Sequence, residues 1–504
     1  MADTDKVIVS NSQALKAKYQ NSGFSTVKAA VDKLIAADTQ RHVKTRLIFI
    51  DDAPTMSKLS GTPPINATDQ RGAKNAVDAI AKALSPDYIV LLDGPDVIPH
   101  IALDNPVPND LDDSIDSDLP YASDVGFSNQ SARYIKITRV LGRIPNVPGA
   151  TSPTNLIGFI NTSVKAKPAP AGNYGGYFGL TAEVWRDSTA LSLDAAFGGH
   201  TTLDVAPPAA PPSTNGRFAK LSHFINCHGS SRRPEFYGQR GTNYPVSMTS
   251  AQVARQGIAG TVVAAECCYG AQPYDPSLTR IADPICIAYL AAGAFGFLGS
   301  TNIAYGPETW NGQADLLTQF FFENVVAGAS LGRSLLQARQ RFVSTQSMTD
   351  PTNLKTLAQF VLLGDPSTTP CLRSHDFLPP SDQLSSEDVT AQRKARRVAL
   401  KSLGDTIPQA KAVPGPRGEV GRAVRARLKA IAEQKGFAGS EIAVFTVKAP
   451  PNYRRAMKAF GDADEHVAVI SRTVDAPSEI IAIRHLVAHI VGDEITKVSE
   501  TVSR

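Results

Sequence analysis

The apolar positions of the first 370 residues fall into short continuous runs, and these runs alternate with segments of helical spacing. The predicted strands cover residues 6–10, 46–50, 88–92, 135–143, 180–185, 218–226, 261–266 and 294–299. The predicted helices cover residues 12–37, 70–84, 152–166, 312–326 and 330–343. Apolar strands that alternate with helices favour an α/β fold, in which helices flank a mostly parallel sheet.

Changes in composition divide the chain further. A stretch rich in Pro and Gly begins at residue 167, which predicts an N-terminal α/β subdomain at 1–166 and a second subdomain at 167–375. A flexible or partly helical basic linker is predicted at 376–440, because residues 391–430 hold eleven Lys and Arg against two acidic residues. The last segment, 441–504, predicts a small α+β domain with strands at 441–447 and 466–471 and helices at 452–460 and 478–490.

Composition narrows the class of protein. The 504 residues are 42% hydrophobic and 19% charged, which is ordinary for a soluble protein of more than one domain. The net charge of +4 is small, and the basic stretch lacks interleaved aromatic residues, so no nucleic-acid partner is expected. Neither a secretion signal nor an apolar run of membrane-spanning length is visible, so we expect a cytoplasmic protein without a membrane partner.

A loop rich in Asp, between residues 95 and 126, raises the question of a metal. Its carboxylates are Asp110, Asp112, Asp113, Asp116, Asp118 and Asp124. Such a cluster could bind calcium through oxygen ligands, but a solvated loop with Asp in its turns is the favoured interpretation. The chain has no Cys-x-x-Cys pair that would indicate a zinc site. We therefore expect no cofactor, with calcium as the alternative.

Two apolar runs end at reactive side chains. One run leads into His228-Gly229, and a later one leads into Cys267-Cys268-Tyr269-Gly270. If the two runs are neighbouring parallel strands, the imidazole and the thiol emerge side by side at the carboxyl edge of the sheet, where open α/β sheets place their sites. A cysteine becomes a useful nucleophile when a base stands beside it. The pair therefore predicts a cysteine-histidine hydrolase.

The chain resembles the gingipain-type cysteine peptidases, within the wider caspase, legumain and separase group. In that group one apolar strand ends in His-Gly, and a later one ends in the nucleophilic Cys. Further blocks of the chain resemble family blocks in the same order: Asp93-Gly94 with Ile98-Pro99, Ser117 to Tyr121, Leu141 to Pro145, and Leu363 to Ser367. The resemblance covers most of residues 1–370 and implies a caspase-like region in two subdomains.

The resemblance also implies an activity, that of a cysteine endopeptidase acting on proteins or peptides. Cys268, favoured over Cys267, would attack the scissile carbonyl to form a thioester. His228 would transfer protons, and the backbone N–H groups of Gly229 and Cys268 would stabilise the oxyanion. Glu183 resembles a family glutamate that approaches the histidine.

Specificity for Arg or Lys is predicted from Asp187, which resembles an acidic residue of the primary pocket in arginine-specific relatives. A surface Asp that caps the following helix is an equally good interpretation. Trp185 or Tyr305 is expected to stack on the substrate. Ser300, Thr301 and Asn302 are expected to form a wall of the pocket. If the pocket selects Arg, the basic residues at 393–397 are candidate sites of self-processing.

Two other functions compete with the endopeptidase. One is a catalytically silent scaffold that binds a peptide or protein partner, and the other is a different thiol acyl-transfer enzyme. The presence of both His228 and Cys268 argues against the scaffold, because a binding module needs neither. Residues 376–504 lie outside the resemblance and are expected to bind a regulatory partner or to regulate the peptidase themselves.

Overall fold

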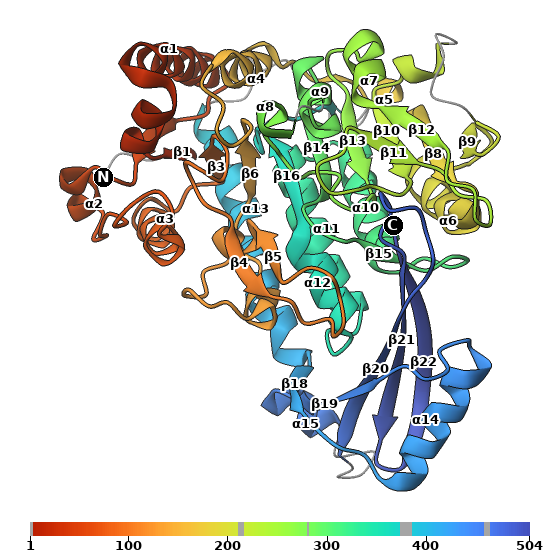
Figure 1. Cartoon of the computed structure of the whole chain (residues 1–504). Coiled ribbons are helices and arrows are strands. Elements are labelled where there is room, and N and C mark those ends of the chain that lie inside the picture. The colour runs from red at the N-terminus through yellow and green to blue at the C-terminus, as the bar shows by residue number, and fades with distance from the viewer. Residues whose placement is uncertain (1–3, 210–215, 280–281, 373–385, 458–463) are drawn as a thin grey trace.

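A ten-stranded sheet forms the centre of the molecule (Figure 1). The computed structural model describes residues 4–209, 216–279, 282–372, 386–457 and 464–504. The strands of the sheet follow one another in the order β2 (Thr45–Phe49), β1 (Lys6–Ser10), β3 (Tyr88–Leu92), β6 (Leu141–Ile144), β16 (Phe360–Gly364), β14 (Gly296–Ser300), β13 (Val262–Ala265), β10 (Ser222–Asn226), β8 (Tyr177–Ala182) and β9 (Leu203–Ala206).

The direction of the strands matches the prediction of a mostly parallel sheet. β16 runs antiparallel to β14, and it joins β6 through the pairing of Leu363 with Arg143. The first four strands come from the predicted N-terminal subdomain and the other six from the second, so both contribute adjoining parts of one sheet. The apolar runs are continuous because most of these strands are buried on both faces.

Helices cover the sheet (Figure 1). One group of mutually contacting helices comprises α1 (Ser12–Gln40), α4 (Thr154–Lys165), α9 (Ile285–Ala291) and α7 (Ser250–Gln256). A second group comprises α6 (Arg186–Phe197), α10 (Gln313–Val326), α11 (Leu331–Thr345) and α12 (Pro351–Gln359). The predicted α/β fold is confirmed. No helix in the described ranges is long and apolar enough to cross a membrane.

Shorter elements decorate this core. The short helices are α2 (Ala53–Lys58), α5 (Gly172–Gly175) and α8 (Pro276–Thr279), and the longer α3 (Gln70–Leu84) packs beside α2. Three small ribbons pair β4 (Ile101–Asp104) with β5 (Ser114–Ser117), β11 (Glu235–Tyr237) with β12 (Val246–Thr249), and β7 (Ala169–Pro170) with β17 (Cys371–Leu372).

The C-terminal domain has an antiparallel sheet and its own core. Its strands are β18 (Val413–Arg417), β19 (Ile442–Lys448), β20 (Glu465–Thr473), β21 (Ile483–Val491) and β22 (Glu494–Ser503), and its helices are α14 (Arg422–Gln434) and α15 (Pro451–Met457). Val424 and Leu428 of α14 pack on the sheet in a separate apolar cluster. This sheet takes its sixth strand, β15 (Tyr305–Gly306), from the second predicted subdomain.

One prediction for the C-terminal part is wrong. The helix expected at 478–490 is strand β21, which pairs with β20 and β22 on its two sides. In the described part of the predicted linker the helical form is the one present, since this part contains a long helix, α13 (Ser386–Thr406), together with β18 and α14. Arg393 of α13 pairs with Asp5, and Arg397 pairs with Asp87, so acidic groups of the N-terminal region hold this basic helix in place.

Candidate active site

His228 and Cys268 stand beside each other in the backbone. They follow neighbouring parallel strands, and each lies three residues beyond the paired Ile225 and Ala265. The loops that carry them touch at Gly229, where an added Cβ would lie 1.9 Å from the carbonyl oxygen of Cys268. The two reactive residues therefore emerge together at the carboxyl edge of the sheet, as the strand-end pattern predicts.

The thiol of Cys268 is held by the backbone of Ala304. The Ala304 N–H donates to Sγ at 3.3 Å, and Sγ lies 3.6 Å from the Ala304 carbonyl oxygen, to which it donates. Burial raises the pKa of the Cys268 thiol to about 12. Cys267 faces a different environment, since it interacts with Cys227. The thiol of Cys268 is therefore protonated at neutral pH in this arrangement.

His228 has one occupied and one open ring nitrogen. Its Nε2 lies 2.7 Å from Oε1 of Gln239. The Gln239 amide nitrogen donates to Gly241 O and Tyr244 Oη, so Oε1 must accept from His228 Nε2–H. Nδ1 is buried and has no hydrogen-bond partner among the described residues. Burial lowers the pKa of His228 to about 4, so the neutral ring offers the Nδ1 lone pair as a base.

The backbone of Arg504, the last residue of the sequence, lies against these groups. The Arg504 carbonyl oxygen accepts hydrogen bonds from the N–H of Cys268 at 3.1 Å and of Gly229 at 3.5 Å. The Arg504 N–H donates to the Ala304 carbonyl at 2.9 Å. Two converging N–H groups form the kind of site that stabilises an oxyanion, and here they hold a carbonyl oxygen of the chain itself.

The side chain of Arg504 fills a closed pocket. Its guanidinium donates to Asp315 Oδ1 at 2.6 Å, to Asn226 Oδ1 at 2.7 Å and to the Pro307 carbonyl at 3.1 Å. The guanidinium carbon lies 4.7 Å from the ring centre of Trp185. Arg504 is fully buried, as are Asp315, Asn226 and Trp185. A planar cation with a fork of donors is matched by acceptors and an aromatic face.

Two acidic groups share this pocket, and they play different electrical roles. Glu266 is buried beside Asp315, and its Oε2 lies 3.9 Å from Nε of Arg504. Burial raises the pKa of Glu266 well above its usual range, and the neighbouring Asp315 carboxylate raises it further. Burial raises the pKa of Asp315 as well, but the Arg504 guanidinium lowers it, and a proton held by Glu266 can be shared with Asp315. We therefore assign the negative charge of the pair to Asp315, which accepts from the guanidinium at 2.6 Å, and the proton to Glu266.

Comparisons with known proteins bear on this region. Residues 228–371 match the model of peptidase family C25. The predicted resemblance to gingipain-type peptidases is confirmed, and the prediction of a cysteine-type hydrolase with it. A solved structure described as "Structure of Protease" covers 99% of this chain and 96% of its own, at 11% identity and a TM-score of 0.46. No curated protein matches the chain.

Two of the predicted site residues, which precede the family match at 228–371, do not make the contacts that were predicted for them. Glu183, predicted to orient His228, pairs instead with Arg240, and Gln239 is the polar partner of the imidazole. Asp187, predicted to bind Arg, has a side chain 61% exposed to solvent and pairs with Arg186. It lies on the surface in the first turn of α6, but the N-cap position belongs to Trp185, so the capping role is not seen.

Trp185 lines the pocket that holds the Arg504 guanidinium. Its ring packs 4.5 Å, centre to centre, from His228 and also faces the guanidinium of Arg504. The Trp185 backbone carbonyl accepts a hydrogen bond from Thr189 at the start of α6, which fixes the tryptophan at the end of β8. One aromatic side chain thus contacts both the candidate base and the candidate specificity pocket.

Ser300, Thr301 and Asn302 support the loop after Cys268 and are not among the hydrogen-bond partners of the Arg504 guanidinium. The carbonyls of Ser300 and Asn302 accept hydrogen bonds from the loop that follows Cys268. Thr301 donates to the carbonyl of Asp116. Their side chains tie the loop after β14 to the N-terminal region, and the guanidinium pocket is built by residues of β10, α10 and β15 instead.

The acidic loop also supports the site. Asp112 accepts hydrogen bonds from the Ile303 N–H and from Tyr269, the residue after Cys268. Lys355 pairs with both Asp110 and Asp112 and supplies the positive charge between them. Among the described residues no group of three or more His, Cys, Asp or Glu side chains could hold a metal ion. Calcium binding therefore gains no support from the arrangement of these carboxylates.

A substitution at Gly229 tests the close approach of the His228 loop to the Cys268 loop. A Cβ at residue 229 would overlap the backbone carbonyl of Cys268, which cannot rotate away. We expect Gly229→Ala to reduce kcat/KM by about 10²-fold, because a misplaced catalytic group loses that much rate. Gly158→Ala in α4 is the matched control, since its Cβ meets nothing within 4 Å. Equal activities of the two variants, measured at equal folded fractions, would contradict the geometry.

Proposed function

We propose that the chain is a cysteine endopeptidase that cleaves peptide bonds after Arg, with Cys268 as nucleophile and His228 as acid and base. One observation carries the proposal. Arg504 lies with its main-chain oxygen on the N–H groups of Cys268 and Gly229 while its side chain pairs with the carboxylate of Asp315. This is the geometry that a substrate needs in the step before attack.

The proposed reaction has two halves. Sγ of Cys268 attacks the carbonyl carbon after the Arg side chain while its proton moves to Nδ1 of His228. The oxyanion rests on the two N–H groups and then collapses, so that the C–N bond breaks and His228 gives its proton to the leaving amine. Water, activated by His228, next attacks the thioester, and the thiol leaves with its proton restored. Gln239 keeps Nε2 protonated throughout, so Nδ1 is the nitrogen that exchanges protons.

Arg is the proposed primary residue rather than Lys. The pocket offers acceptors at Asp315, Asn226 and the Pro307 carbonyl, which a fork of guanidinium N–H groups can satisfy together. A Lys ammonium is a single point donor and would leave part of this acceptor set without a partner. Glycine at residue 306 makes the space, since a Cβ there would lie 2.0 Å from the guanidinium.

Self-processing at residues 393–397 would need these residues to leave helix α13. Peptidases bind substrates as extended strands, and Arg393 and Arg397 are engaged by N-terminal groups in the helix. A cleavage there therefore depends on prior opening of α13.

Covalent labelling tests the proposal. An arginyl peptide that carries a thiol-directed electrophile is incubated with the protein, and the modified residue is located by peptide mass mapping. We expect one adduct at Cys268, lost in His228→Ala and reduced when the peptide carries Glu in place of Arg. Labelling spread over several cysteines, or insensitive to the Arg side chain, would oppose the assignment. The labelling is done on the full-length Arg504→Ala protein, because its arginine pocket is open to the peptide.

A further inference from the structure

The strand that precedes Arg504 lies where a peptide substrate would bind. β22 pairs antiparallel with β15, through Tyr305 with Ser503 and Gly306 with Val502. Figure 1 shows the C-terminus beside β15 in the catalytic half, while the rest of the C-terminal sheet projects away from it. Addition of a strand to an exposed edge is a standard way for peptides to bind. β15 is thus the acceptor edge, and it is taken by the chain's own residues.

Occupation by this strand and binding of another substrate exclude each other. The two N–H groups that would hold a substrate oxyanion hold the Arg504 carbonyl. The pocket that would hold a substrate arginine is filled by the buried Arg504 guanidinium. The occupied site is therefore a resting one.

The strand is anchored from the C-terminal domain. β22 pairs along its length with β21, and the Ser503 side chain bonds both the Ile481 carbonyl and the Ile483 N–H. The domain also touches the catalytic half away from β22. Ser471 donates to the Pro108 carbonyl, and the ring of His485 packs on that of Tyr305. These contacts hold Arg504 near the pocket, where tethering gives an effective concentration of the order of millimolar.

We infer that residues 502–504 act as an intramolecular inhibitor, which occupies the arginine pocket and the oxyanion site of the peptidase and must be displaced before another substrate is cleaved. The inference rests on the proposed function of the same site. The C-terminal domain is then the regulatory part of the chain, with β22 as its inhibitory strand. Whatever draws β22 off β15 activates the enzyme.

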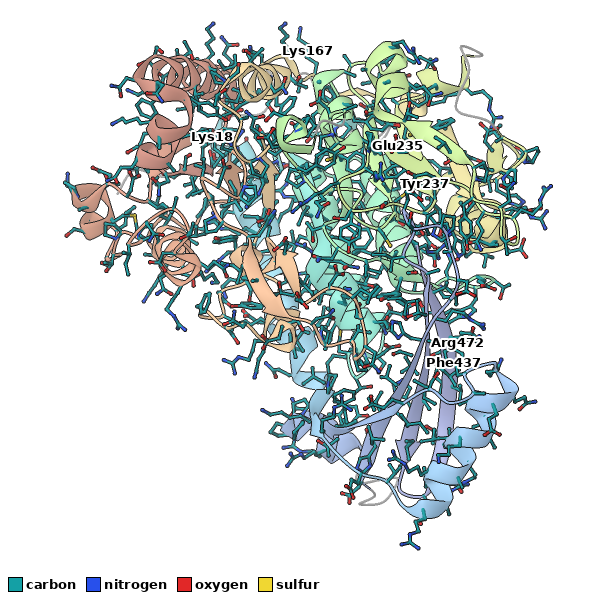
Figure 2. The ribbon with its side chains drawn as sticks, in the orientation of Figure 1. Lys18, Lys167, Glu235, Tyr237, Phe437 and Arg472 are labelled. Carbon is teal, nitrogen blue, oxygen red and sulfur yellow. The ribbon has the colours of Figure 1, made fainter. Side chains whose placement is uncertain are left out.

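The experiment compares full-length variants on a short arginyl reporter peptide. With a tether at about millimolar concentration and binding of Arg504 at about micromolar, we expect Arg504→Ala to turn over the reporter about 10³-fold faster than the unaltered chain. Arg504→Lys is expected to fall between the two, because it retains the charge but loses the fork of donors. Arg472→Ala is the matched control. Arg472 is an exposed arginine of β20, in the same domain but outside the pocket (Figure 2), and its variant should match the unaltered chain.

A second measurement keeps the test valid if Arg504→Ala unfolds the C-terminal domain. A synthetic peptide with the sequence of residues 499–504 should inhibit Arg504→Ala competitively, and the same peptide ending in Ala should not. If the unaltered chain and Arg504→Ala cleave the reporter equally well, the inhibition is wrong and the proposed function stands. If neither cleaves it, and Cys268 is not labelled either, the proposed function itself fails. Absence of inhibition by the Arg peptide at millimolar concentration also overturns the inference.

Discussion

Replacing Cys268 with Ala is expected to reduce turnover of an arginyl peptide by about 10⁴-fold or more, the scale seen when a catalytic nucleophile is removed. The physical reason is position. Sγ of Cys268 and the backbone N–H of Arg504 both donate to the carbonyl oxygen of Ala304. The thiol therefore lies beside the position that a substrate arginine would take when its carbonyl is attacked. Turnover is measured in the Arg504→Ala background, in which the pocket is open.

Cys267→Ala is the matched control for this variant. The two cysteines are adjacent and both buried, but Cys267 interacts with Cys227 while Cys268 faces Ala304. Removing one buried sulfur should cost about 1 kcal/mol of folding free energy and leave kcat/KM within a few-fold of the parent. If Cys267→Ala were the inactive variant and Cys268→Ala the active one, the nucleophile would be the other cysteine.

Strand placement was predictable because it depends on local sequence. The runs that lead to His228 and Cys268 are apolar at nearly every position, which is typical of strands buried on both faces. The same reasoning failed at 478–490, where apolar residues are so dense that helix and strand spacing both fit. A two-residue Gly492-Asp493 connection between β21 and β22 is a hairpin signal that would have identified the strand.

The pocket could not be predicted, because its members are distant in sequence. Asn226 precedes the histidine, Asp315 begins a helix, and Arg504 is the last residue. Their encounter depends on how α10 packs against the sheet and how the C-terminal domain returns to β15. Asp187 drew attention because it lies close in sequence to β8, but on the first turn of α6 it faces solvent. The one available signal was an acidic residue near the start of an otherwise apolar helix, at Asp315.

Substituting Asp315 is expected to remove the preference for Arg. Asn has the same shape as Asp but no charge, so Asp315→Asn leaves a buried guanidinium without its counter-ion. Breaking one side of a buried charge pair costs about 2–5 kcal/mol, which corresponds to a loss of roughly 30-fold to 4,000-fold in kcat/KM for an arginyl peptide. Cleavage after citrulline, the uncharged analogue of Arg, should change much less, so the ratio of the two rates is the measurement.

Two variants in the same Arg504→Ala background separate the carboxylates. Asp187→Asn should behave as its parent, because that side chain is exposed and pairs with Arg186. Glu266→Gln should keep the Arg preference, since the raised pKa of Glu266 leaves it protonated at neutral pH and an amide can replace it as a donor to Asp315. An equal loss of Arg preference in Glu266→Gln and Asp315→Asn would mean that both carboxylates are ionised when substrate binds. If only Asp187→Asn lost the preference for Arg, the arginine pocket would have to lie at the start of α6.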